Sequence, residues 1–141
     1  MALRVGIDLV SVTAVRESLA AHGRRYLERV YTEAEVADCA GADAPDPVRL
    51  AARFAAKEAA IKVLRPGPDQ PVPWPSIEVR RHCGGWVGLD LHGEAAALAA
   101  AAGAGDFTVS ITHEGGVAAA VVVAAVEGAS EQLRSPVKEP A

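Results

Sequence analysis

Two carboxylates stand where the surrounding pattern is apolar, and together they could bind a cation. Asp8 interrupts the apolar run "LRVGIDLV" (3–10), and Glu58 lies beside Lys57 in the alanine-rich stretch "RFAAKEAAIK" (53–62). Burying an unpaired carboxylate is costly, so two such acids are most simply explained if they share a cation. Magnesium takes one or two protein carboxylates and completes its shell with water and phosphate. The pattern therefore predicts a magnesium site at Asp8 and Glu58.

Basic residues and a histidine lie at positions that suit a phosphorylated ligand. Lys62, Arg65 and Arg53 are close in sequence to Glu58, and ammonium and guanidinium groups bind phosphate. In "SITHEGG" (110–116), His113 ends a predicted strand at a tight turn. A histidine held and exposed there could act as a general acid or base beside a phosphate, or it could be a solvent-facing turn residue without such a role.

The Lys57-Glu58 pair also has a purely structural interpretation. At about 100° per residue, the helix predicted around it carries Lys57 in the middle of an apolar stripe and Glu58 at its edge. Glu58 and Lys62 at i,i+4 could form a surface pair worth about 0.3–0.5 kcal/mol, while Lys57 extends past its neighbours to water. If Glu58 is instead a magnesium ligand, Lys57 is interpreted as a structural or interface cation whose partner the sequence does not identify. The residues of the predicted stripe are Leu50, Phe54, Ile61 and Leu64.

The elements that must position these residues follow from hydrophobic periodicity, capping signals and turn residues. They predict an α+β fold in which a mainly antiparallel sheet packs against a long helix and shorter helices, in one domain over 1–126 with a polar, flexible tail over 127–141. In chain order, we expect a buried strand over 3–10, helical turns over 13–27 broken at His22-Gly23, and a short helix capped by Thr32 and Glu35 that ends near Cys39. A loop over 41–47 then leads into a helix from 47 or 48 to 64, which is followed by an irregular proline-rich segment over 65–75. The remaining elements are a hairpin of 76–82 and 86–92, a helix over 93–102, and a hairpin of 107–113 and 117–126.

Composition excludes several classes of protein. With 141 residues, 50% hydrophobic and 23% charged, the chain has the size of one domain. A net charge of -4 argues against a nucleic-acid binder that works by general attraction. The longest apolar run, 117–126, is too short to cross a membrane. Without a secretory signal, and with Cys39 and Cys83 far apart, we expect a cytoplasmic protein with reduced thiols.

Three motifs, in their order and separation, resemble the holo-acyl-carrier-protein synthases, the small single-domain class of 4′-phosphopantetheinyl transferases. They are "VGIDLV", "RFAAKEAAIKVL" and "VSITHEGGVAAAVVV", and the resemblance covers nearly all of residues 4–126. It implies transfer of the 4′-phosphopantetheine group of coenzyme A to a serine of an apo acyl carrier protein, with release of adenosine 3′,5′-bisphosphate. It also implies a magnesium ion on the pyrophosphate and a homotrimer with active sites between subunits.

Carried over by position, the resemblance makes Asp8 and Glu58 the metal ligands and places Lys62 at the phosphates. Arg53 and His113 would lie at the nucleotide end, and the strand end from Ser110 to Glu114, including Thr112, would line the cleft from the neighbouring subunit. Two candidates remain for the base that takes the serine proton: Glu58 acting through water, which we prefer, and His113. The predicted catalytic residues are Glu58, Lys62 and His113, and the predicted contacts with coenzyme A are Arg53, Lys62, Arg65, Thr112 and His113.

The sequence departs from the family pattern at two places. After the long helix, "RPG" (65–67) replaces the usual glycine-threonine-glycine turn, so Arg65 could offer its guanidinium to phosphate instead. Ala14 replaces an arginine that grips the acidic carrier, although basic residues remain for docking: Arg16, Arg24, Arg25 and Arg29. A carrier of fatty-acid synthesis and one of polyketide or related secondary metabolism are both compatible with this pattern, and tolerance of acylated coenzyme A stays open.

Two rival functions follow from the same residues. The altered 65–67 turn would suit a non-catalytic homologue that binds coenzyme A or a carrier without transfer. Alternatively, the chain could be a small-molecule-binding trimer of unrelated chemistry. In that case Asp8 and Glu58 would only be paired with Lys57 or with arginines.

Overall fold

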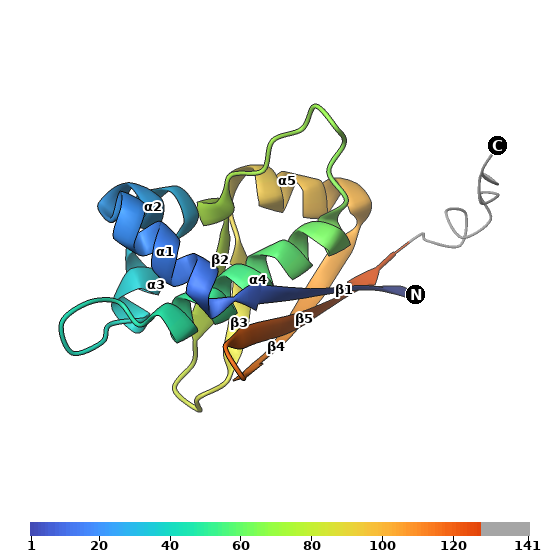
Figure 1. Ribbon diagram of the computed structural model, residues 1–141. Coiled ribbons are helices and arrows are strands. Elements are labelled where there is room, and N and C mark those ends of the chain that lie inside the picture. The colour runs from blue at the N-terminus through green and yellow to red at the C-terminus, as the bar shows by residue number, and fades with distance from the viewer. Residues whose placement is uncertain (128–141) are drawn as a thin grey trace, which may run out of the picture.

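The computed structural model describes residues 1–127, so the predicted tail lies outside the described residues except for Glu127. Figure 1 shows the α+β arrangement expected from the sequence, with helix α4 (Pro47–Leu64) lying across a three-stranded sheet. The other helices are α1 (Val12–His22), α2 (Arg24–Val30), α3 (Glu33–Asp38) and α5 (Gly93–Ala102), with a short 3-10 turn η1 (Trp74–Ser76). The strands are β1 (Ala2–Ser11), β2 (Ile77–Arg81), β3 (Val87–Leu91), β4 (Ala104–Glu114) and β5 (Val117–Val126).

The strands form two antiparallel sheets, as the two predicted hairpins require. The larger has the order β1-β5-β4, and the smaller is the β2-β3 hairpin. Gly115 and Gly116, with φ of 60° and 80°, make the tight turn after β4. The predicted break after His22 is confirmed, since Gly23 has φ of 51° and separates α1 from α2. The Thr32–Glu35 capping box is also confirmed.

Strand β1 differs from its predicted description as a buried strand. Its apolar side chains point away from α4 and are 62–67% exposed: Leu3, Val5, Ile7 and Leu9. The alternate positions face α4, and there Gly6 lies so close to the helix that a Cβ would come 2.1 Å from the carbonyl oxygen of Ala59. Asp8 therefore belongs to the inward face of β1, two residues from the closest approach of strand and helix.

Helix α4 is buried around most of its circumference, so a single apolar stripe is too narrow a description. Phe54 and Ile61 of the predicted stripe are only partly buried, whereas Leu50 and Leu64 are fully buried. The helix contacts β1, β4 and β5 on one side and α1, α5 and β2 elsewhere. Small side chains permit this close packing, and the alanines of α4 that are at most 4% exposed are Ala51, Ala52, Ala55, Ala56, Ala59 and Ala60.

Lys57 does not extend to water, which corrects the surface interpretation of the Lys57-Glu58 pair. Its side chain is 0% exposed, and Nζ donates to Glu35 Oε1 at 2.7 Å and to the carbonyl oxygens of Trp74 and Ile77 at 3.0 and 2.5 Å. Glu35 is equally buried and also accepts the backbone N–H of Val79. Burial lowers the pKa of Lys57, and Glu35 raises it. The pair therefore joins α3, α4, η1 and β2 in the core.

Candidate functional site

Three of the predicted site residues converge in one small pocket. Asp8 comes from the inward face of β1, and Glu58 and Lys62 lie one turn apart on α4; Ile61 and Trp74 complete the lining of a space of about 210 Å³. Lys62 Nζ donates to Asp8 Oδ1 at 3.2 Å and to the Ile7 carbonyl oxygen at 2.7 Å. Lys62 thus pairs with Asp8, and the surface Glu58–Lys62 pair considered from the sequence is not among the ion pairs of the described residues.

The electrostatics of this carboxylate pocket suit a cation. Burial and the neighbouring Asp8 carboxylate raise the pKa of Glu58 to about 7, although Lys62 lowers it. Within the part of the chain that the structure describes, Asp8 Oδ2 is buried without a hydrogen-bond partner. Within residues 1–127, no group of three or more His, Cys, Asp or Glu side chains is arranged to hold a metal, so a cation here would rest on these two carboxylates. Magnesium accepts such a site when water and phosphate supply its other ligands.

The raised pKa of Glu58 gives a stability prediction with a definite sign. Below pH 4.5 the carboxyl is protonated in both folded and unfolded chains; between about pH 4.5 and 7 the unfolded chain ionises first, so wild-type stability falls as pH rises. In metal-free buffer at pH 8, Glu58→Gln is therefore expected to be about 1 kcal/mol more stable than wild type, after allowing for solvent screening of a partly exposed group. Thermal unfolding should show a Tm about 3 °C higher for the variant.

The same Tm difference is expected to disappear at pH 4. A variant less stable than wild type at pH 8 would contradict this interpretation, because it would mean that the ionised Glu58 is stabilised by an ion pair. Lys57, which the rival binding function paired with Asp8 or Glu58, instead pairs with Glu35, whereas Asp8 does have a cationic partner in Lys62.

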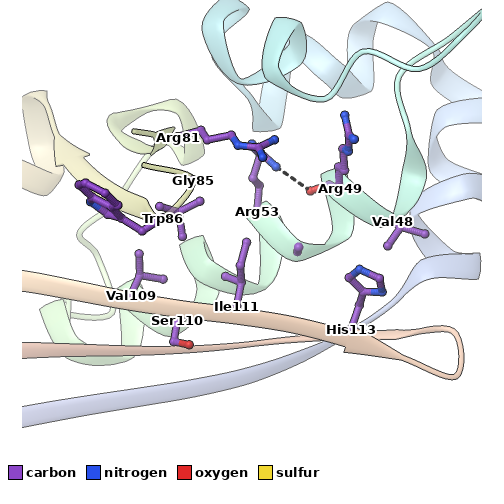
Figure 2. A pocket seen from close by; sticks show the side chains of 12 residues that line it. Val48, Arg49, Arg53, Arg81, Gly85, Trp86, Val109, Ser110, Ile111 and His113 are labelled. Carbon is purple, nitrogen blue, oxygen red and sulfur yellow. Dashed lines mark hydrogen bonds between the residues drawn. The ribbon is translucent and has the colours of Figure 1, made fainter. Parts of the chain in front are cut away.

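A second, basic pocket lies further towards the N-terminal end of α4. Its volume is about 410 Å³, and Figure 2 shows Arg49 and Arg53 of α4, Arg81 and Trp86 of the β2-β3 hairpin and His113 of β4 around it. The residues that line it include no carboxylate. Arg53 is 4% exposed and donates from Nη1 to the Arg49 carbonyl oxygen, and its Nε is buried without a partner among the described residues. Such a pocket suits an anion with several acceptor oxygens, such as a phosphate ester.

The structure divides the predicted metal, catalytic and coenzyme A residues between these two pockets and leaves Thr112 and Arg65 outside both. Arg53 and His113 come together in the basic pocket, so His113 does not line the carboxylate pocket of its own chain. Thr112 pairs with Ala119 and, because side chains alternate along a strand, it points to the opposite face from His113. Arg65 ends α4 with φ of 53° and lies near Arg4, lining neither pocket.

Sequence reasoning missed several residues that line the two pockets, among them Arg49, Arg81 and Trp86 of the basic pocket and Trp74 of the carboxylate pocket. Trp74 stands in the proline-rich segment, where no regular element was expected, and Arg81 and Trp86 flank the turn of the β2-β3 hairpin. An aromatic residue in a segment otherwise rich in proline, and another beside a glycine turn, were the available signals. Neither indicates by itself which helix it faces, because that depends on how the hairpin packs on α4.

The basic residues predicted for docking lie on α1 and α2. Arg25 and Arg29 line a groove of about 370 Å³ together with His22 and Tyr26. Arg24 is exposed, with its Nε 3.9 Å from Glu28 Oε1, and Arg16 is exposed on α1. The structure therefore separates a pair of arginines at a groove from two arginines on open surface.

The fold is a small α+β domain with a carboxylate pocket, whose oxygens suit a hard cation, and a basic pocket, whose guanidinium donors suit phosphate. A family model for the 4′-phosphopantetheinyl transferase superfamily matches residues 4–122. The holo-[acyl-carrier-protein] synthases of Moorella thermoacetica and Koribacter versatilis are 42% and 40% identical over 86% and 87% of this chain and 92% and 98% of theirs. An ACPS-CoA complex from Chronobacterium ammoniagenes superimposes with a TM-score of 0.78 at 32% identity, covering 90% of this chain and 99% of that one. The chain belongs to the holo-[acyl-carrier-protein] synthase family of the 4′-phosphopantetheinyl transferase superfamily.

Every helix within residues 1–127 falls short of the length and apolarity that a membrane span requires.

Proposed function

We propose that this protein transfers the 4′-phosphopantetheine group of coenzyme A to a serine of an apo acyl carrier protein, with magnesium bound at Asp8 and Glu58. The observation that carries the proposal is the carboxylate pocket, in which Asp8 Oδ2 is buried without a partner beside Glu58 and Lys62. The names of the relatives support the reaction, and the similar Chronobacterium structure is a complex with coenzyme A.

In this reaction the serine hydroxyl oxygen bonds to the phosphorus of the phosphopantetheine, the pyrophosphate P–O bond breaks, and adenosine 3′,5′-bisphosphate leaves. Magnesium, when bound, neutralises charge on the pyrophosphate. Lys62 supplies a further positive charge from the same pocket. The serine proton needs a base within reach of it, and Glu58, acting through water, is our candidate in the carboxylate pocket.

The nucleotide end of coenzyme A is assigned to the basic pocket. Arg53 has an unpartnered Nε there, and His113 lies across the pocket on β4. On this assignment His113 would contact phosphate in its own chain, which supports our preference for Glu58 over His113 as the base. Thr112, which faces the opposite side of β4, would contact coenzyme A only from a neighbouring subunit.

The proposal includes a homotrimer. The observation that supports it is the apolar character of the outer face of the β1-β5-β4 sheet. Leu3, Val5, Ile7 and Leu9 together form an exposed apolar strip on β1, and a strip of this kind marks an interaction surface. In the register of the sheet, Ile7 is opposite Val121 of β5, which is opposite Ser110 of β4. The outer face thus brings apolar strand residues together with the strand end that contains Thr112.

Ile7→Glu is expected to convert the trimer to monomers, because it places a charge in the middle of the apolar strip. Sedimentation equilibrium should give three chain masses for wild type and one for the variant. Ala20→Glu, on the exposed face of α1, is the matched control and should stay trimeric. A monomeric wild type, or an Ile7→Glu protein that still sediments at three chain masses, would contradict the assignment of this face.

Arg25→Glu and Arg29→Glu are each expected to raise the KM for an acidic carrier at least about tenfold, since opposite charges steer association. The KM for coenzyme A should change little and serves as the internal control. With wild type, the carrier KM should also rise with ionic strength more steeply than the coenzyme A KM. Equal sensitivity of the two KM values to salt would count against a basic docking surface on α1 and α2.

The proposed reaction is tested by incubating the protein with coenzyme A, magnesium and a panel of apo carriers, and weighing each carrier by mass spectrometry. We expect at least one carrier to gain the mass of phosphopantetheine. If no carrier gains this mass while coenzyme A still binds, the non-catalytic alternative is correct. The feature that favours this alternative is Arg65, which ends α4 in the left-handed conformation and is followed by Pro66. We also propose a cytoplasmic location. Its support is that Cys39 and Cys83 are both free thiols, as expected in a reducing compartment.

A further inference from the structure

Trp74 forms the apolar side of the carboxylate pocket. It lines that pocket with Ile61, and the polar residues of the lining are Asp8, Glu58 and Lys62. Its ring packs edge-on against Phe54, with centroids 5.1 Å apart and planes at 72°. The indole therefore presents an apolar surface within one small space that also contains the candidate metal ligands.

The buried Lys57 holds the backbone of Trp74 in place. The Trp74 carbonyl oxygen accepts hydrogen bonds from Lys57 Nζ and from the Ile77 backbone N–H. Lys57 is in turn held by Glu35, and both side chains are 0% exposed. Trp74 begins the short turn η1 within the proline-rich segment, and Lys57 adds a contact from α4 to the local hydrogen bond that Ile77 makes.

The chemistry of coenzyme A determines which of its groups would contact the apolar residues of the carboxylate pocket. On one side of the pyrophosphate the chain continues into a polar ribose, and on the other into the pantoyl group, whose quaternary carbon carries two methyls one CH₂ away from the phosphate oxygen. The basic pocket with Arg53 and His113 accounts for the nucleotide side. An apolar surface directly beside the phosphate position therefore matches the dimethyl group.

We propose that Trp74 is a specificity-determining residue that packs against the pantoyl group of coenzyme A, and that Lys57 is a positioning residue that holds it there. The proposal rests on the proposed function. It predicts a contact made by coenzyme A and by no part of adenosine 3′,5′-bisphosphate, which lacks the pantoyl group.

Calorimetric titration with coenzyme A and with adenosine 3′,5′-bisphosphate tests this contact. Trp74→Ala is expected to weaken coenzyme A binding on the order of tenfold, the size typical of one lost apolar contact, with the bisphosphate affinity unchanged. Trp74→Phe keeps a ring against Phe54 and should retain most of the coenzyme A affinity. Equal losses for both ligands, or no loss for either, would overturn the assignment of Trp74.

The supports of Trp74 are tested by two further variants. Phe54→Leu removes the ring packed on Trp74, and Lys57→Met combined with Glu35→Gln removes the buried lysine without leaving an unpaired charge. Each is expected to shift the ratio of the coenzyme A affinity to the bisphosphate affinity in the same direction as Trp74→Ala. Combined with Trp74→Ala, each should add little to that shift, because the effects of residues that act through one another are not additive. A folded Lys57→Met/Glu35→Gln protein with the wild-type ratio overturns the positioning role, as does full additivity with Trp74→Ala.

If the Lys57→Met/Glu35→Gln protein does not fold, the Phe54→Leu ratio decides whether displacing the ring matters. A wild-type protein that binds neither ligand would instead refute the proposed function, so the two failures are distinguishable.

Discussion

Glu58→Gln is expected to lower kcat for phosphopantetheine transfer by about 10²–10⁴-fold, the range associated with loss of a positioned acid or base. Glutamine fills the same space but can neither accept the serine proton nor offer a charged oxygen to magnesium. The requirement for magnesium should weaken in the variant, because Asp8 would be the remaining carboxylate in the pocket. Steady-state rates measured across a magnesium titration provide the comparison.

The stability of the Glu58→Gln protein separates a chemical role from a structural one. At pH 8 without metal the variant is expected to unfold at a higher temperature than wild type, as derived above, so lost activity would not reflect a lost fold. Glu94→Gln, an exposed carboxylate in the first turn of α5, is the matched control and should keep wild-type kcat. Wild-type kcat in Glu58→Gln would remove Glu58 from the mechanism.

Lys57→Met is expected to reduce the free energy of unfolding by about 3–5 kcal/mol, because it leaves Glu35 buried without its cation. Glu35 is 0% exposed and would keep only backbone donors from Thr32 and Val79. The loss is measured by urea unfolding, and a value of this size would remove a large part of the stability of a small domain.

The double variant Lys57→Met/Glu35→Gln is expected to recover much of that loss, since no isolated charge remains in the core. A single Lys57→Met variant as stable as wild type would show that the pair contributes no more than a surface ion pair. In that event the packing of η1 and β2 on α4 would have to depend on apolar contacts alone.

The carboxylate site was predictable because its residues break their local patterns. Asp8 and Glu58 are acids among apolar residues, and the structure places them in one pocket with Lys62. The hairpins and the α3 cap were predictable for a similar reason, because Gly115-Gly116 and the Thr32–Glu35 spacing have local signatures. Features with a local physical cause were thus recovered from sequence alone.

The environments of Lys57 and β1 were not predictable, because both depend on distant segments. Lys57 finds its counterion 22 positions away in Glu35, and helical periodicity cannot reveal a partner on another helix. On β1, apolar residues such as Ile7 alternate with residues such as Asp8, and the pattern gives no sign that the apolar set points away from α4. That orientation follows from the close approach of Gly6 to Ala59, a tertiary contact.

The most direct test of the central claim is a crystal structure of the protein with coenzyme A and manganese, located by its anomalous scattering. We expect the metal bound by Asp8 and Glu58 and by pyrophosphate oxygens, with Lys62 at the phosphates and the nucleotide end beside Arg53. Manganese bound elsewhere, or coenzyme A bound with its pyrophosphate outside the carboxylate pocket, would contradict the account.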